Sequence, residues 1–212
     1  MQAELLHSGT IVPTILGMVL GRPISFDTDE VIDRATQVFW SQGYTATSMA
    51  DLLAATRLSR SSLYETFAGK EALFRRCLQH YADVLAGSLA SQLEQTDDAR
   101  GFIRQTFLQF ARQADAAEVR QGCFAMNTAV ELGHTDSELA GEAQQSIQRF
   151  RRVFEQAIRQ AQSQGTISTD KDAAALAQYL VASMSGLRML IQCGATPDEA
   201  ERTVQIMLRP LD

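Results

Sequence analysis

The placement of proline constrains this chain more than any other feature. The four prolines stand at positions 13, 23, 197 and 210, so none interrupts residues 24–196. An internal proline breaks a helix because it lacks a backbone N–H and its ring clashes with the preceding turn. The long proline-free stretch therefore favours long helices.

Apolar periodicity and capping residues predict a compact set of helices near the N-terminus. The first begins after a cap at Asp27 or Thr28 and ends before Gly43. Its apolar stripe, with helical spacing, consists of Val31, Ala35, Val38 and Phe39. A cap at Thr47 or Ser48 starts a second, short helix that runs to about residue 55.

A third helix is predicted over residues 60–67 after a short turn, and a fourth begins near Lys70. Two short helices joined by a turn of three to four residues form a helix-turn-helix. The second helix of such a unit enters the major groove of DNA, and its N-terminal side chains contact base edges. The segment therefore predicts a DNA-binding unit.

The first turn of the third helix carries the side chains that this chemistry requires. Arg60 can contact guanine O6 and N7, and Ser61 and Ser62 can bond to several base edges. Tyr64 can donate its hydroxyl to a phosphate, and the free N–H groups of the helix start can do the same. The alternative is an ordinary capped surface helix.

The rest of the chain reads as helical, with spans predicted at residues 70–95, 98–114, 118–132, 136–164, 171–193 and 197–209. Asp170 is the expected cap of the fifth of these spans. Its apolar seam is formed by Leu176, Leu180, Met184, Leu187 and Leu190. The predicted fold class is all-α.

Composition excludes several classes of protein. The net charge of −6 argues against a general nucleic-acid binder, but residues 18–76 are neutral and the acidity lies in residues 77–212. No Cys or His cluster has metal-ligand spacing, so we expect no metal and no cofactor. Cys77 and Cys193 lie on apolar stripes and are expected to pack. We expect no membrane span, no catalytic residues and a cytoplasmic protein.

Three motifs resemble the N-terminal signature of TetR/AcrR-type transcriptional regulators. They are GRPISFD, FWSQGYTATSMADLLAAT and LSRSSLYETFAGKEALF, within residues 21–81. The later segments GCFAMNTAVEL and G-x-I…A…GLR resemble one subgroup of that family less specifically. The resemblance implies an all-helical homodimer that pairs through its two C-terminal helices. It also implies double-stranded operator DNA and a small-molecule effector as partners.

The resemblance also implies roles for individual residues. Thr47, Tyr64 and Lys70 match phosphate-contacting positions, and Arg22 matches a basic arm. The positions matching base-facing places are Arg60, Ser61, Ser62 and Thr66. Arg57 departs from the pattern, because the family usually has glycine in this turn, where a positive φ suits glycine.

These observations and the resemblance divide the chain into three segments. Residues 1–21 are a disordered segment or an extension, residues 22–76 are the helix-turn-helix domain, and residues 77–212 are the ligand-binding and dimerisation domain. Candidate ligand-binding residues of the last part are Phe107, Phe110, Cys123, Met126, Asn127, Phe154 and Met184.

Most of these candidates have a simpler interpretation as core. Aromatic and methionine side chains at helical spacing pack in a core and equally line a pocket. Asn127 is either a buried hydrogen-bonding anchor or part of an exposed face. Cys123 is either a small buried residue or, near a helix start, a reactive thiol.

The predicted function is a ligand-responsive regulator of transcription, with a repressor as the expected type. An effector that prefers the conformation with the wrong spacing between recognition helices would release the protein from its operator. The alternative is a regulator that senses electrophiles or oxidants through Cys123.

Overall fold

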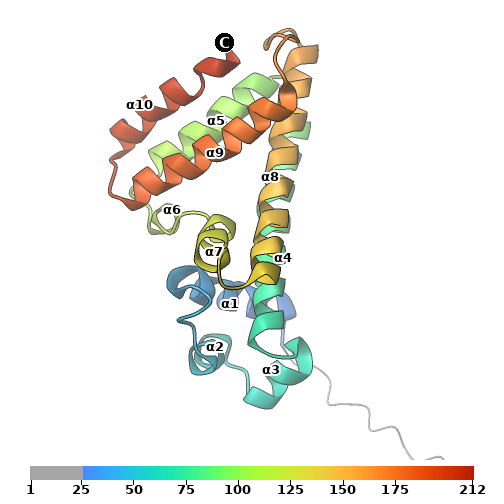
Figure 1. Cartoon of the computed structure of the whole chain (residues 1–212), viewed down its shortest axis with the longest axis vertical. Helices are drawn as coiled ribbons and strands as arrows, with labels where there is room; N and C mark the ends of the chain where they lie inside the picture. Colours follow the sequence, from blue (N-terminus) through green and yellow to red (C-terminus); the bar gives the residue numbers. More distant parts are fainter. Residues whose placement is uncertain (1–25) are drawn as a thin grey trace, which may run out of the picture.

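The computed structural model describes residues 26–212 and is helical throughout that part of the chain (Figure 1). The helices are α1 (Thr28–Gln42), α2 (Met49–Thr56), α3 (Arg60–Phe67), α4 (Lys70–Glu94), α5 (Ala99–Arg112), α6 (Ala117–Arg120), α7 (Phe124–Leu132), α8 (Ser137–Ser163), α9 (Ala173–Gln192) and α10 (Pro197–Met207). A short 3-10 helix, Arg209–Leu211, follows α10. The all-α prediction is confirmed.

The predicted helix-turn-helix forms from local capping chemistry. The side chain of Asp27 accepts from the N–H groups of Asp29 and Glu30, and starts α1. Ser48, rather than Thr47, caps α2 through a reciprocal pair of bonds with Asp51. Each cap satisfies N–H groups that have no partner inside the helix.

The core of this unit uses the predicted apolar residues. Leu52 and Leu63 are fully buried, and Phe67 is nearly so. Phe39 packs edge-on against Phe74 of α4, with ring centroids 4.8 Å apart. The start of α4 is therefore part of the same core as α1 and α3.

The helix α4 links the two ends of the molecule. It begins beside α3 at one end and lies alongside α8 on the long axis of the molecule (Figure 1). The predicted boundary between residues 76 and 77 falls inside this continuous helix. The division of the chain at that point stays a prediction.

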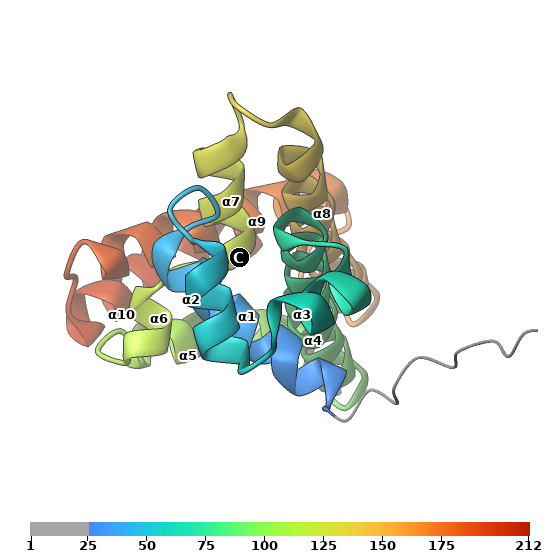
Figure 2. The same ribbon diagram turned by 90° about the horizontal axis from the view of Figure 1, so that it is seen from below.

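The remaining helices form the opposite end. In Figure 1, α5, α9 and α10 lie together across the upper part of α4 and α8, and Figure 2 shows α1, α2 and α3 from below. One apolar cluster joins these helices, from Leu89 to Leu211. A second cluster joins α1 to α4 with α7 and Phe150 of α8.

Three details differ from the sequence-based expectations. The span predicted at 118–132 is two helices, because Gly122 takes a φ of 78° and breaks the chain between α6 and α7. Asp172, not Asp170, caps α9 by accepting from the N–H groups of Ala174 and Ala175. Cys193 is exposed because it lies just beyond the end of α9, so the expectation that it packs is wrong.

The helix α9 passes the length and composition test for a membrane span, with a mean hydropathy of 1.3. This result differs from the expectation, made from the sequence, that the chain has no membrane span. A core helix of a soluble protein passes the same test, and α9 packs against α5, α8 and α10. Its Leu180 and Leu187 are fully buried, whereas Leu190 is 45% exposed, so the predicted seam is only partly internal.

Candidate DNA-binding surface and ligand cavity

The first turn of α3 presents polar side chains to solvent. Ser59 caps the helix, and its hydroxyl accepts from the N–H of Ser62 at 3.1 Å. The same oxygen lies 2.9 Å from the hydroxyls of both Ser61 and Ser62. Arg60 is exposed and forms no ion pair with any residue of 26–212. These side chains, together with Tyr64, form what we call the α3 surface.

The predicted DNA contacts that follow the first turn of α3 differ in their exposure to solvent. Tyr64 is 48% exposed, although large apolar or aromatic side chains usually pack. Thr66 is half-buried. The Nζ atom of Lys70, at the start of α4, lies 4.4 Å from the ring centroid of Tyr44. That contact gives Lys70 a partner within the protein as well as a position beside the α3 surface.

For two further predicted DNA contacts, Thr47 and Arg22, the structure shows no place on this surface, because one is buried and the other lies outside the described residues. Thr47 is buried, with 1% of its surface exposed, and its hydroxyl donates to the carbonyl of Gly43 at 2.6 Å. Its side chain holds the turn between α1 and α2, and a phosphate contact by Thr47 stays a prediction. Arg22 lies outside the described residues, as do residues 1–21.

The turn between α2 and α3 contains the departure seen in the sequence. Arg57 takes a left-handed conformation, with φ 58° and ψ 23°, where glycine costs least. Its side chain is exposed and forms no ion pair with the described residues. A second basic side chain therefore lies free in the turn that precedes the α3 surface.

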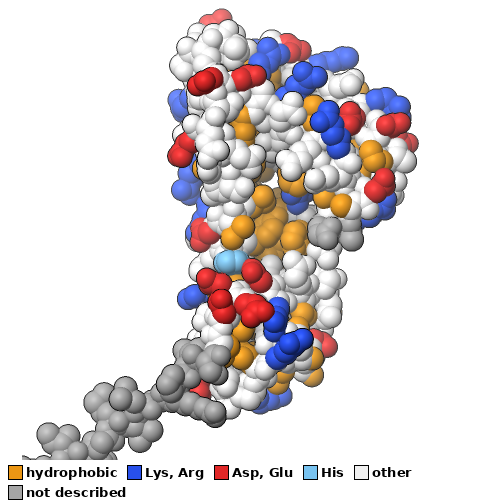
Figure 3. Space-filling model, turned by 180° about the vertical axis from the view of Figure 1, so that it is seen from behind, with side chains coloured by type: hydrophobic (Ala, Val, Ile, Leu, Met, Phe, Trp, Pro, Cys, Tyr) orange, Lys and Arg blue, Asp and Glu red, His pale blue; other side chains and the backbone are white. Residues whose placement is uncertain are grey.

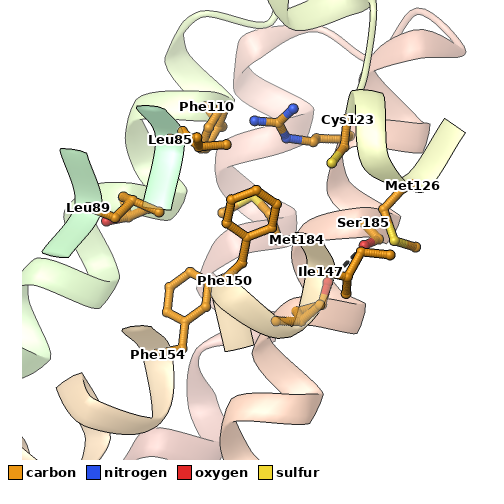
Figure 4. Close-up of a pocket in the computed structure, with 13 residues that line it drawn as sticks. Leu85, Leu89, Phe110, Cys123, Met126, Ile147, Phe150, Phe154, Met184 and Ser185 are labelled. Atoms are coloured by element: carbon orange, nitrogen blue, oxygen red, sulfur yellow. Dashed lines mark hydrogen bonds between the residues drawn. The ribbon is translucent and has the colours of Figure 1, made fainter. Parts of the chain in front are cut away.

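A cavity lies among five helices of the other part of the chain. It is lined from α4 to α9 by Leu85, Leu89, Thr106, Phe110, Cys123, Met126, Ile147, Phe150, Phe154, Val181, Met184, Ser185 and Arg188. Figure 4 shows these side chains converging from different helices. The volume of the cavity is about 50 Å³.

The cavity brings together most of the predicted ligand-binding residues. Phe110, Cys123, Met126, Phe154 and Met184 all line it. Phe107 does not, because it is fully buried in the core with its ring 6.0 Å from that of Phe154. Asn127 faces a neighbouring surface groove and donates through Nδ2 to the carbonyl of Gln121 at 2.9 Å. A role in ligand contact stays a prediction for all seven.

Sequence reasoning missed the charged residue of this cavity. Arg188 of α9 is only 7% exposed, and its guanidinium lies 4.1 Å from the ring centroid of Phe110. It donates to the carbonyl of Gly122 at 2.6 Å. The signal available in the sequence was a lone arginine inside the apolar run Gly186 to Leu190.

The thiol of Cys123 is enclosed rather than open to solvent. It is 9% exposed and accepts from the hydroxyl of Tyr81 at 3.6 Å. Burial raises the pKa of Tyr81, and the nearby charge of Arg188 opposes that rise. The N-terminus of α7 has no side-chain cap, but nothing in this arrangement favours a sensing thiol over a packed one.

Contacts from α7 and from the loop before it reach the helix-turn-helix. The carboxylate of Glu131 accepts from the N–H of Tyr44 at 3.0 Å and from that of Thr45 at 2.7 Å. The indole N–H of Trp40 donates to the carbonyl of Gln121 at 3.2 Å. We call these contacts the α7 clamp. The residue next to Gln121 is Gly122, which Arg188 holds from the cavity side.

The ionisation of Glu131 reflects this clamp. Burial by itself raises the pKa of the carboxyl group. The bonds from Thr45 and Tyr44 and the charge of Lys70 outweigh it, and the pKa is lowered overall. The carboxylate is therefore ionised at neutral pH and attracts the turn between α1 and α2.

Charge is distributed unevenly over the surface. Figure 3 shows basic and acidic side chains interspersed on the upper part, a group of acidic side chains lower down with basic ones beside it, and apolar side chains in the hollow between. Among large apolar side chains, those exposed on α9 and α10 include Met189, Leu190 and Ile206. Such residues are available to contact another molecule.

Comparison with known proteins gives a consistent set of relatives. Residues 31–77 match the family described as bacterial regulatory proteins, tetR family, and residues 99–207 match the tetracyclin repressor-like C-terminal domain. The HTH-type transcriptional repressor ComR of Escherichia coli (strain K12) is 30% identical over 89% of this chain and 90% of its own length. The repressor DhaR of Mycobacterium sp. (strain GP1) is 30% identical over 82% of this chain and 87% of its own.

Among solved structures, a similar one is a cysteine mutant of the TetR family transcriptional regulator CifR, complexed with 26bp double-strand operator DNA. It is 26% identical, with a TM-score of 0.76, over 90% of this chain and 100% of that one. The reduced form of NemR from E. coli has a TM-score of 0.77 at 16% identity, over 84% of this chain and 93% of that one, which shows the fold alone.

Proposed function

The chain belongs to the TetR family of bacterial transcriptional regulators, and on that premise we propose that it is a homodimeric repressor released from its operator by a small-molecule effector. The observation that carries the proposal is the α3 surface. It places Arg60, which forms no ion pair with the described residues, and three hydroxyls at the start of the second helix of a helix-turn-helix. Repression is the activity named for the curated relatives ComR and DhaR.

The proposed contacts divide into two kinds. Arg60, Ser61, Ser62 and Thr66 face the bases, and Tyr64, Lys70 and Arg22 contact the phosphates, as does Arg57 in the preceding turn. The three serine hydroxyls at the start of α3 lie within one hydrogen-bonded cluster, so a base contact by one of them reorganises the others. Only the base contacts distinguish one DNA sequence from another.

The dimer sets the geometry of recognition. Two copies of α3 must lie about 34–36 Å apart, one turn of DNA, to enter successive major grooves. We propose that the two C-terminal helices form the dimer interface, because α9 and α10 expose Met189, Leu190 and Ile206. An effector that favours another separation of the two α3 helices releases the DNA.

Two connections lead from the cavity to the α3 surface. The cavity is lined by Leu85 and Leu89 of α4, and α4 continues to Lys70 beside α3. The cavity is also lined by Cys123 and Met126, which adjoin the α7 clamp on the turn between α1 and α2. A ligand that moves either helix therefore moves part of the DNA-binding unit.

This proposal needs no catalytic residue, metal or cofactor, and it places the protein in the cytoplasm, where its DNA is. The domain division at residues 76 and 77 assigns DNA binding to the first part and effector binding to the second. It also leaves Cys123 as a packed wall residue of the cavity. Thiol sensing has no specific observation in its favour.

The test is a DNA-binding measurement by fluorescence anisotropy. The duplex upstream of the protein's own coding region is compared with a scrambled duplex over a series of salt concentrations. Replacing Arg60 by Ala should weaken binding to the native duplex roughly tenfold to a hundredfold and reduce the preference between duplexes. Tyr64→Phe should weaken binding to both duplexes alike, because phosphate contacts carry no sequence information.

A matched control keeps the charge change but moves it away from the DNA. Arg104 on α5 is exposed and unpaired among the described residues, and Arg104→Ala should leave binding unchanged. Equal affinity of the wild-type protein for native and scrambled duplexes would count against this operator. Insensitivity of a sequence-specific complex to Arg60→Ala would refute the role of the α3 surface.

A further inference from the structure

Arg188 is a buried charge without an acidic partner in the described part of the chain. It is 93% buried by residue surface, and no carboxylate among residues 26–212 forms an ion pair with it. Its partners are the carbonyl of Gly122 and the ring of Phe110. An ionised group in a low-dielectric site is costly unless it is paired and hydrogen-bonded. A guanidinium has five N–H donors, and one carbonyl does not satisfy them.

The other cavity side chains do not supply the missing negative charge. Besides Arg188, the wall is aliphatic, aromatic or sulfur-containing, with Thr106 and Ser185 as its two hydroxyl residues. Both hydroxyls donate to their own helices, Thr106 to the carbonyl of Phe102 and Ser185 to that of Val181. Arg188 is therefore the one charged group of an otherwise apolar wall.

The chemistry of the wall specifies a complementary ligand. Apolar surface favours an aromatic or branched hydrocarbon body, and Arg188 favours an anionic head. A guanidinium matches a carboxylate especially well, because two parallel N–H groups can bond to its two oxygens. The guanidinium carbon of Arg188 already lies over the ring of Phe110, 4.1 Å from its centroid.

The size of the cavity limits this ligand. A space of about 50 Å³ accepts few heavy atoms as it stands. Met126 and Met184 are flexible side chains and can move aside to enlarge it. A compact ligand fits these conditions better than a long-chain or multi-ring one.

We propose that the effector is a small carboxylate with a compact apolar body, and that Arg188 binds its carboxylate inside the cavity. That the ligand acts as an effector rests on the proposed function, but the existence of the binding site does not depend on that function. The guanidinium has donors beyond the one that it gives to the carbonyl of Gly122, and Gly122 is next to Gln121, whose carbonyl accepts from Trp40. A carboxylate bound to Arg188 thus acts on a side chain that contacts the residue next to the α7 clamp.

The test compares probes that share a shape and differ in charge. Benzoate, phenylacetate and 3-methylbutanoate are each titrated into the full chain by calorimetry, next to benzamide, phenylacetamide and 3-methylbutanamide. At least one acid should bind the wild-type protein roughly tenfold to a hundredfold more tightly than its amide, the range expected for a hydrogen-bonded charge pair. Equal binding of every acid and its amide, or no binding by any acid, would overturn the proposal.

Two variants separate a ligand contact from a structural role. Arg188→Met should abolish the preference for the acid, and Arg188→Lys should keep part of it, because it retains the charge and loses the bidentate geometry. Arg104→Met is the control, because Arg104 is an exposed arginine outside the cavity wall, and it should keep the preference. An undiminished preference in a folded Arg188→Met protein would also overturn the proposal.

The same experiment distinguishes this proposal from the proposed function. Calorimetry contains no DNA, so acid binding with no sequence-specific DNA complex would sustain the binding site and count against the proposed operator. A sequence-specific DNA complex without a preference for any acid over its amide would support the DNA-binding function and refute the carboxylate site. Where both hold, the bound acid should weaken the DNA complex.

Discussion

Glu131 offers a direct test of how the two parts of the molecule are joined. Its carboxylate accepts from the backbone N–H groups of Tyr44 and Thr45, which lie 87 and 86 residues away in the sequence. Hydrogen bonds to a charged group contribute about 1.5–3 kcal/mol each when water cannot replace them. Thr45 is exposed, so water replaces part of each bond after the carboxylate is removed.

We therefore expect Glu131→Ala to lower the free energy of unfolding by about 2 kcal/mol, and Glu131→Gln by about 1 kcal/mol, because the amide retains one acceptor oxygen. Urea denaturation measures both values. Hydrogen exchange should show faster exchange at the amides of Tyr44 and Thr45, because their bonds open without global unfolding.

The pH dependence checks the sign of this effect. The folded pKa of Glu131 is depressed below its ordinary value of 4.5. The stability it contributes is therefore present above that value and is lost as the pH falls through the folded pKa. The difference between the wild type and Glu131→Gln should be largest at neutral pH and should shrink in acid.

An exposed carboxylate provides the control. Glu94→Gln removes the same charge at a site with no ion pair among the described residues, and it should change stability by less than about 0.5 kcal/mol. Equal stability of Glu131→Ala and the wild type at neutral pH, with unchanged exchange at Tyr44 and Thr45, would refute the reasoning.

Further predictions concern the backbone and the core. Gly43→Ala should lower stability by about 1–2 kcal/mol or more, because φ is +81° and the new Cβ would lie 2.7 Å from an oxygen of Glu131; thermal unfolding measures the loss, and an unchanged Tm would contradict it. Arg57→Gly should raise stability by roughly 0.5–1 kcal/mol, since relief of the left-handed strain exceeds the added chain entropy of glycine; the same variant should flatten the salt dependence of DNA binding if Arg57 contacts a phosphate. Phe107→Ala should cost about 3–5 kcal/mol in urea denaturation, because the ring is fully buried against Phe154; a cost near zero would place Phe107 in the ligand cavity rather than in the core.

Much of the fold follows from local sequence signals. The caps at Asp27, Ser48 and Ser59 set the starts of α1, α2 and α3, because each satisfies N–H groups within three residues of itself. The left-handed φ of Arg57 was foreseeable in the same way, as a turn position at which the family usually has glycine. Such signals act over a few residues, so no tertiary contact is needed to interpret them.

Local signals failed in two situations. In one, two similar capping residues lie close together in the sequence, and in the other, contacts from distant residues decide the backbone conformation. Asp170 and Asp172 are equally good caps by type, but Asp170 is hydrogen-bonded to Ser168 in the preceding turn, and Asp172 caps α9. The break at Gly122 was hidden because the flanking apolar residues continue a helical pattern across it. That segment leaves helical geometry where Arg188 and Trp40 hold its carbonyls, contacts that no short window contains.

By itself, therefore, the sequence determined the helical class, the helix-turn-helix and the residues of the α3 surface. The tertiary structure decided which aromatic and methionine side chains surround a cavity and which, like Phe107, fill the core. It also decided that the guanidinium of Arg188 faces that cavity and that Glu131 holds a turn 86 residues away. The reason is physical: helix starts depend on neighbours in the chain, whereas a cavity and a buried charge depend on how distant helices pack.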